Sequence, residues 1–260
     1  MKTAIAIGAH PDDIEFGMAG TLVLLRRGGY EIHYFNVANG CCGSRQFGAR
    51  QLARVRLAEA KRAAKVLGAH FHPPVCNDLE ILYGLKLLRR VAAVIREVQP
   101  AVVLTHPPVD YMEDHTNTCR LVVTAAFARA MPNFRSVPPR PAADCELTVY
   151  HCVPHTLLDP LRRPVVPEAF VNVASVLADK CAALAEHRSQ QDWLGPSQGI
   201  DSLRTHVEAN ARFIGAVSKR YRFAEGWRRH LHHGFSALEV DPLRDALGKD
   251  YLVGNGTRKH

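Results

Sequence analysis

Four consecutive residues near the N-terminus could bind a metal ion and activate a water molecule: His10-Pro11-Asp12-Asp13. They follow a short apolar run over 4–8 that we predict to be a buried strand. Two neighbouring carboxylates repel each other, and a divalent cation removes that cost. Because consecutive side chains point in different directions, one carboxylate could bind the ion while the other holds a water beside it. The same residues would also suit an ordinary Asp-rich turn or a helix N-cap.

A second loop, Asp110 to His115, could complete such a site. It follows a predicted strand over 101–105 and precedes a predicted helix over 117–130. His115 could reach the first loop and form a His-Asp-His set. Three protein ligands with open positions for water are typical of a catalytic zinc site, whereas a structural site is closed by four ligands. The alternative is that Asp114 or His115 only caps the following helix.

The elements that would position these loops alternate between short apolar runs and helical patterns. This alternation predicts an α/β fold, a Rossmann-like three-layer sandwich whose mostly parallel sheet has helices on both faces. Ligands bind to such sheets where loops leave the carboxyl ends of the strands, which selects the loops 9–16, 38–47 and 106–118. The other expected elements are helices over 17–27, 49–67, 85–98, 176–191 and 202–218, and strands over 32–37, 147–151 and 169–173.

The chain of 260 residues is expected to form a single domain, 1–260, near the upper limit for one hydrophobic core. Within it, residues 1–131 would form the Rossmann-like metal-binding part, and 144–235 a C-terminal part that completes the sheet and the cleft. The tail, 236–260, has weak patterning and would wrap the surface or a neighbouring subunit.

Composition argues against several classes of protein. No apolar run approaches the roughly 20 residues of a membrane helix, and the N-terminal run is too short for a signal peptide, so we expect a cytoplasmic protein. The seven cysteines are odd in number and form no CxxC pair, which favours reduced thiols. The net charge is +8, but the basic residues are scattered doublets, so no nucleic acid is expected as a partner.

The sequence resembles the LmbE-like, or PIG-L-like, N-acetylglucosaminyl deacetylase family. The resemblance rests on His10 to Asp13 with Glu15 nearby, on the helix sequence from Arg56 to Gly68, on the Asp110 to His115 loop, and on His187-Arg-Ser-Gln190. It covers roughly the first 130 residues well and the remainder loosely.

The resemblance implies one Zn²⁺ per chain, bound by His10, Asp13 and His115, with Asp12 as the general base. It implies a hydrolase that removes an N-acetyl (N-acyl) group from an amino sugar or its conjugate. The expected partner is therefore a small molecule. A homo-oligomer is possible on the same grounds, because the family often forms symmetric assemblies.

Met112 departs from the family's loop, which usually reads Asp-x-His-x-Asp-His with that first histidine as the acid. A thioether cannot donate a proton. A relocated histidine could replace it, with His106, His155 and His187 as candidates, and we predict His155 as the catalytic acid. Alternatively Asp12 shuttles the proton both ways, or the chain is a weakened, metal-bearing binding protein.

Three further residues are predicted to bind substrate: Arg56, Asp78 and Asp114. A solvent-facing pair with Glu59 would explain Arg56 equally well, and a plain turn would explain Asp78. The Gly-rich loop Asn39 to Ser44 is expected to approach the substrate.

Two other motifs are set aside. Gly195-Pro-Ser-Gln-Gly199 matches the GxSxG string, but no strand precedes Ser197 and the string is predicted to lie in a loop between helices. His230, His232 and His233 lack a carboxylate or Cys partner, so an exposed or site-rim loop is favoured over a second metal site. The runner-up function is a zinc amidase that acts on a non-sugar N-acyl substrate.

Overall fold

The computed structural model describes residues 2–154, 156–198 and 202–254. These residues form one sheet in the order β3-β2-β1-β4-β5-β7-β6-β8. The first five strands in this order are parallel, and the pairs from β5 to β8 are antiparallel. The strands are β1 (Thr3–Gly8), β2 (Glu31–Asn36), β3 (His70–His72), β4 (Val102–Thr105), β5 (Thr148–Cys152), β6 (Ala169–Asn172), β7 (Ala224–Arg229) and β8 (Tyr251–Val253).

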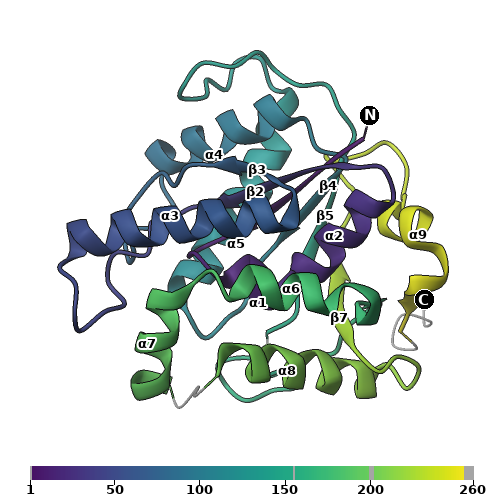
Figure 1. The fold of residues 1–260 in the computed structure, drawn as a ribbon. Helices are drawn as coiled ribbons and strands as arrows, with labels where there is room; N and C mark the ends of the chain where they lie inside the picture. Colours follow the sequence, from purple (N-terminus) through teal and green to yellow (C-terminus); the bar gives the residue numbers. More distant parts are fainter. Residues whose placement is uncertain (1, 155, 199–201, 255–260) are drawn as a thin grey trace.

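Helices cover both faces of this sheet, so the predicted three-layer architecture is confirmed. One apolar cluster packs α2, α3 and α6 against β1 and β2, and Figure 1 shows α3 and α6 running across the near face. A second cluster packs α4 and α5 against the opposite face. The helices are α1 (Asp13–Gly17), α2 (Ala19–Arg27), α3 (Ala49–Leu67), α4 (Leu85–Val98), α5 (Glu113–Phe127), α6 (Leu177–Leu184), α7 (Arg188–Gln198), α8 (Leu203–Val217) and α9 (Pro242–Leu247).

Most predicted elements have the expected position, and α3 and α4 have the expected bounds. The helix predicted over 176–191 is instead two helices, α6 and α7, which are separated at 185–187. The helix predicted from Asn117 begins at Glu113, so Asp114 and His115 lie in its first turn. Residues 195–198 of the GxSxG string continue α7, so the predicted loop is wrong there, while Gly199 lies outside the described residues.

The C-terminal part contributes more to the sheet than the sequence suggested. Strand β7 was not predicted, and it lies between β5 and β6. Its Trp227 is fully buried and donates a hydrogen bond from Nε1 to Oγ1 of Thr21 (3.0 Å). The tail forms α9 and then β8, which pairs with β6 at the edge of the sheet. Residues 251–253 therefore extend the sheet, and α9 packs Leu243 and Leu247 into the apolar core.

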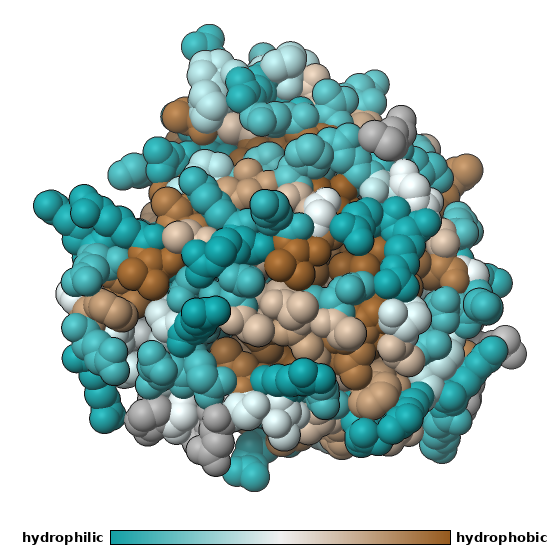
Figure 2. Space-filling view, in the orientation of Figure 1, coloured by the Kyte–Doolittle hydropathy of each residue, from teal (hydrophilic) through white to brown (hydrophobic). Residues whose placement is uncertain are grey.

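The surface alternates between hydrophilic and apolar side chains. Figure 2 shows apolar residues gathered across the middle of the face seen in Figure 1, with hydrophilic residues around them. None of the helices in the described part of the chain is long and apolar enough to span a bilayer.

Candidate active site

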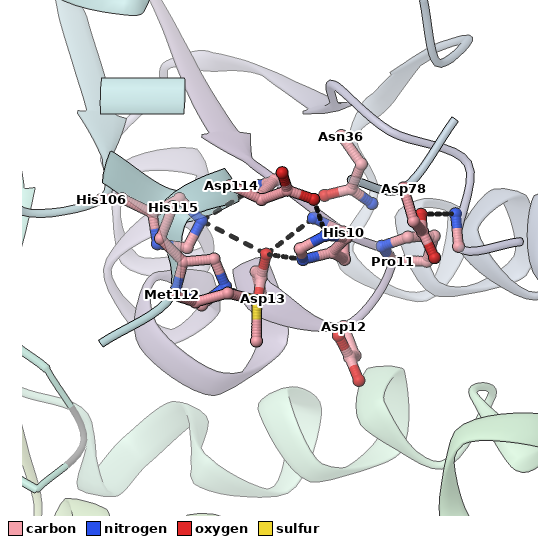
Figure 3. Close-up of polar contacts among 12 residues, drawn as sticks. His10, Pro11, Asp12, Asp13, Asn36, Asp78, His106, Met112, Asp114 and His115 are labelled. Atoms are coloured by element: carbon pink, nitrogen blue, oxygen red, sulfur yellow. Dashed lines mark hydrogen bonds and ion pairs between the residues drawn. The ribbon is translucent and has the colours of Figure 1, made fainter. Parts of the chain in front are cut away.

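Asp12 and Asp13 lie where β1 ends and α1 begins. The φ of Asp12 is 111°. For a residue other than glycine this left-handed region costs on the order of 1–3 kcal/mol, and such strain clusters at functional sites. Figure 3 shows Asp13 directed toward the surrounding imidazoles and Asp12 directed away from it. The two carboxylates therefore diverge, as the sequence led us to expect.

Asp13 lies between two of the imidazoles. Its Oδ1 is 3.3 Å from Nε2 of His115, and its Oδ2 is 3.5 Å from Nδ1 of His10. One ligand atom from each of these three residues lies within 4.8 Å of the other two. Nε2 of His115 is buried and makes no hydrogen bond. A divalent cation would satisfy that nitrogen and the facing carboxylate, so the three predicted ligands fit a metal ion.

Neighbouring carboxylates raise the pKa values of both histidines in this cluster. Burial lowers the pKa of His10, but Asp114 and Asp13 outweigh it and raise that pKa to about 9. Burial likewise opposes the charge on His115, and Asp13 and Asp110 raise its pKa to about 10. A metal ion that binds here displaces these imidazole protons, so its binding becomes tighter as the pH rises.

Buried carboxylates orient both histidines from behind. Oδ2 of Asp114 accepts hydrogen bonds from Nε2 of His10 (2.9 Å) and from the backbone N–H of Leu79 (2.8 Å). Oδ1 of Asp110 lies 3.1 Å from Nδ1 of His115. Such outer-shell partners fix the tautomer and the ring orientation of metal-binding histidines. Asp114 was predicted to bind substrate, but it is buried behind His10 and is not among the residues that line the cavity described below.

Arg56 is buried and holds the loop that carries Asp12. Its guanidinium donates hydrogen bonds to the carbonyl of Pro11 (2.9 Å) and to that of Gly40 (3.1 Å), and lies 3.8 Å from Oδ2 of Asp12. Glu59 is also buried and accepts from Ser189 instead, so the alternative of a solvent-facing pair is wrong. Burial raises the pKa of Asp12 to about 7 even though Arg56 opposes this shift.

Asp78 fixes the Gly-rich loop after β2. Its two oxygens accept the backbone N–H groups of Gly40 (2.6 Å) and Cys42 (2.9 Å). Gly40 has a φ of 76°, and a Cβ there would come within 2.6 Å of the Arg56 side chain. Only glycine therefore suits that position. Asp78 lines the cavity while it organises this loop.

The candidate acids do not all reach the site. His106 does line the cavity, and its Nε2 lies 3.2 Å from Oδ2 of Asp13. The same nitrogen accepts the backbone N–H of Ala9 (2.9 Å), and burial with the neighbouring His115 lowers the pKa of His106. His187 is fully buried with Nε2 3.3 Å from Glu15, and it is not among the cavity-lining residues. His155 lies outside the described residues, so its predicted role is not tested.

A cavity of about 300 Å³ opens beside the metal ligands. Its polar wall contains His10, Asp12, Asp13, Arg56, Asp78 and His115. Its opposite wall is largely apolar and comes from α1, the end of β5, α7 and α8. That wall contains Phe16, Val153, Pro154, Leu194, Ala211 and Ile214. Met112 and Tyr111 also line the cavity.

A comparison with protein families matches the N-terminal part of the chain, which contains this site. The family model described as PIG-L: GlcNAc-PI de-N-acetylase matches residues 5–126. This region contains Asp12 and the three candidate ligands, which confirms the resemblance drawn from the motifs and the expectation of an enzyme of a deacetylase family.

The relatives of this chain include two different activities. A diacetylchitobiose deacetylase from Thermococcus kodakarensis is 27% identical over 235 residues, covering 88% of this chain and 83% of the relative. A 4-oxalmesaconate hydratase from Pseudomonas putida is 27% identical over 234 residues, covering 86% and 88%. Among solved structures, the N,N'-diacetylchitobiose deacetylase from Pyrococcus horikoshii is 23% identical with a TM-score of 0.73, covering 93% of this chain and 88% of that one. It shows the same fold.

Several residues of the site were missed from the sequence. Asp110 was quoted in the loop but received no role, although its spacing of five residues from His115 brings it to that imidazole across the start of α5. The apolar wall was missed because its residues come from α1, α7, α8 and the end of β5, and no local pattern connects these segments.

Proposed function

We propose that the chain is a metal-dependent hydrolase that removes an N-acyl group, with acetyl as the simplest case, from an amino sugar or its conjugate. Zn²⁺ is the proposed ion, held by His10, Asp13 and His115. The observation that carries the proposal is the meeting of this ligand set and Asp12 in the wall of one cavity.

A bound divalent ion lowers the pKa of a water molecule and polarises an amide carbonyl. Asp12 diverges from the ligand Asp13 and lines the cavity, which suits it to take a proton from the attacking water. Arg56 holds the Pro11 carbonyl and lies beside the Asp12 carboxylate, so it fixes the position of the base. Asp114 and Asp110 orient the two histidine ligands.

The departing amine needs a proton when the C–N bond breaks. Met112 lines the cavity but cannot supply one. Of the three histidines considered, His106 accepts a backbone N–H through Nε2 and His187 is absent from the cavity lining, so His155 is the proposed donor. The alternative is that Asp12 returns the proton it took from the water.

The charges around the cavity favour a neutral amide over a carboxylate substrate such as that named for the hydratase relative. Four aspartates line the cavity: Asp12, Asp13, Asp78 and Asp110. The Arg and Lys side chains that line it, Arg56 and Lys180, are both engaged, the first with two backbone carbonyls and the second with Glu225 and the Phe16 carbonyl. Apart from the proposed metal ion, a substrate carboxylate would therefore meet these aspartates without a free Arg or Lys side chain among the described residues that line the cavity.

The apolar wall favours an acyl chain longer than acetyl, and it supports the second candidate, a zinc amidase that acts on a non-sugar N-acyl substrate. Arg56 and Asp78 already bind backbone groups, so fewer polar groups are available for sugar hydroxyls than the sequence suggested. A small-molecule substrate, a cytoplasmic location and a homo-oligomer stay predictions.

Metal analysis of the purified chain, followed by release of carboxylic acid from a panel of N-acyl glucosamines and simple N-acyl amines, tests the proposal. We expect about one zinc per chain and hydrolysis that a chelator abolishes and zinc restores. Bound zinc without release of acid from any substrate would favour the binding protein. A chain that neither holds zinc nor gains activity with it would refute the proposal.

A further inference from the structure

The loop that follows β2 brings two sulfur atoms close to the carboxylate of Asp78, and none of these three residues is among the histidine-site ligands. Cys41 and Cys42 are adjacent in sequence, and their Sγ atoms are 3.7 Å apart. One oxygen of Asp78 and the two sulfurs all lie within 4.8 Å of one another. Both cysteines are free thiols, and Cys42 is exposed to solvent.

The distance between the two sulfurs is compatible with both of them binding one metal ion. Two thiolates bound at about 2.3 Å to a tetrahedral ion lie about 3.8 Å apart. A disulfide would require about 2.05 Å. At the observed 3.7 Å one thiol can donate a hydrogen bond to the other, and the same distance would let both thiolates bind one tetrahedral cation without moving apart.

The third group is held in place before any ion binds. Asp78 is buried, and each of its oxygens accepts one backbone N–H, from Gly40 and from Cys42. Each carboxylate oxygen has a second lone pair that these bonds leave available. The loop is braced further, because the side chain of Asn39 donates to Asn77 (2.8 Å) and accepts the N–H of Cys41 (3.1 Å).

The two clusters differ in chemistry. Thiolate ligands select soft or borderline cations such as zinc and cadmium, whereas imidazole and carboxylate ligands accept a wider range of divalent ions. We propose that Cys41, Cys42 and Asp78 form a second cation site, specific for a thiophilic divalent ion and separate from the site of His10, Asp13 and His115. Its fourth position is open to water. Since Cys42, Gly43 and Asp78 line the cavity, an ion bound there stands in the wall of the substrate space.

Cadmium titration of the full chain tests this site without measuring activity. Cadmium bound to thiolate gives an ultraviolet charge-transfer band that the nitrogen and oxygen ligands of the histidine site do not give. We expect the band to rise to about one equivalent of cadmium. The band should be lost in the double variant Cys41→Ser/Cys42→Ser and retained in the matched control Cys76→Ser. In Asp78→Asn the band should persist with its midpoint shifted to higher cadmium.

A band that persists unchanged in the double serine variant would overturn the proposal, and so would a folded wild-type chain that shows no band. If the double variant fails to fold, X-ray absorption at the cadmium edge of the wild-type chain decides the matter. Two sulfur neighbours support the site, and a shell of only nitrogen and oxygen refutes it. Neither result depends on whether the chain hydrolyses an amide.

Discussion

His10 and Asp114 are joined by a hydrogen bond of 2.9 Å between Nε2 of the imidazole and Oδ2 of the carboxylate. Because this bond engages Nε2, the other ring nitrogen, Nδ1, is the one that faces Asp13 and would bind the metal. Asp114 thus determines which nitrogen of His10 is available.

Asp114→Asn should weaken zinc binding by about 10- to 100-fold, the usual effect of losing an outer-shell partner. The neighbouring Glu113, whose carboxylate contacts only the Asn117 side chain among the described contacts, provides the control Glu113→Gln. Competition with a chromophoric chelator measures both affinities. Equal affinity in the two variants would contradict the orienting role of Asp114.

Asp12→Asn should retain zinc and lose turnover, because the amide cannot accept a proton from water. A general base contributes about 10²- to 10⁴-fold, and the loss in kcat should lie in that range. His115→Ala should instead lose the metal itself. Metal content and kcat measured on the same preparations separate the two roles. Loss of metal in Asp12→Asn would instead make Asp12 a ligand.

Arg56→Lys should lower kcat although the charge is retained. The guanidinium donates to the carbonyls of Pro11 and Gly40 at the same time, and an ammonium group cannot reproduce that fork. We expect destabilisation of about 1–3 kcal/mol, since a buried carbonyl is left without its donor. Arg54→Lys, on an exposed part of the same helix, is the control. Urea unfolding and steady-state kinetics on both variants provide the comparison.

Acid should destabilise the fold through His33. Burial, with smaller contributions from His72 and His70, lowers its pKa from 6.5 to about 4, while Glu31 and Glu97 oppose the shift. The unfolded chain therefore binds this proton more readily than the folded chain does. Its contribution to stability is complete above pH 6.5 and is lost as the pH falls toward 4.

His33→Gln should remove part of this dependence. Between pH 7.5 and 4.5 the variant should lose about 2 kcal/mol less unfolding free energy than the wild type. The exposed His233, which is not among the groups that shift the pKa of His33, supplies the control His233→Gln. Urea unfolding at the two pH values tests the prediction, and identical losses in all three proteins would count against it.

The apolar wall of the cavity should make the enzyme prefer substrates with longer acyl chains. Each added methylene of the acyl chain should raise kcat/KM by about fourfold until the wall is filled, from about 0.8 kcal/mol per buried CH₂. Ile214→Trp should reverse that gain while hydrolysis of the acetyl substrate persists. Phe213→Trp, on the exposed side of the same helix, should leave the series unchanged. If acetyl is the preferred group in every variant, the wall has another role.

The sequence predicts the parallel half of the fold well because its signals are local. The apolar periodicity of α3 and its glycine C-cap at Gly68 give both ends of that helix. Strand β7, A-E-G-W-R-R, lacks such a signal because two arginines and a glutamate interrupt it. Its Glu225 is stabilised by Lys180 and by the N-terminus of α2, which are contacts that no local pattern reveals.

The candidate site also divides into residues with a local sequence signal and residues placed by contacts between distant segments. The types and spacing of His10, Asp13 and His115 indicate a metal whatever lies around them. The position of Arg56 depends on packing between α3 and two loops, so its partners, Pro11 and Gly40, were not predictable. The hydrogen bond between Asp114 and His10 was not predictable for the same reason, because the buried position of Asp114 follows from where α5 begins.

The proposed metal ligands come from segments that are far apart in the sequence. His10 follows β1, and His115 lies in α5, which follows β4. The two histidines come together only when β4 pairs with β1, two strands that are far apart in the sequence. The proposed metal site therefore forms only after this non-local pairing, which is intrinsically slow. The rate at which the refolding protein acquires zinc should therefore follow the pairing of β1 with β4. Zinc uptake would then report when these two strands come together.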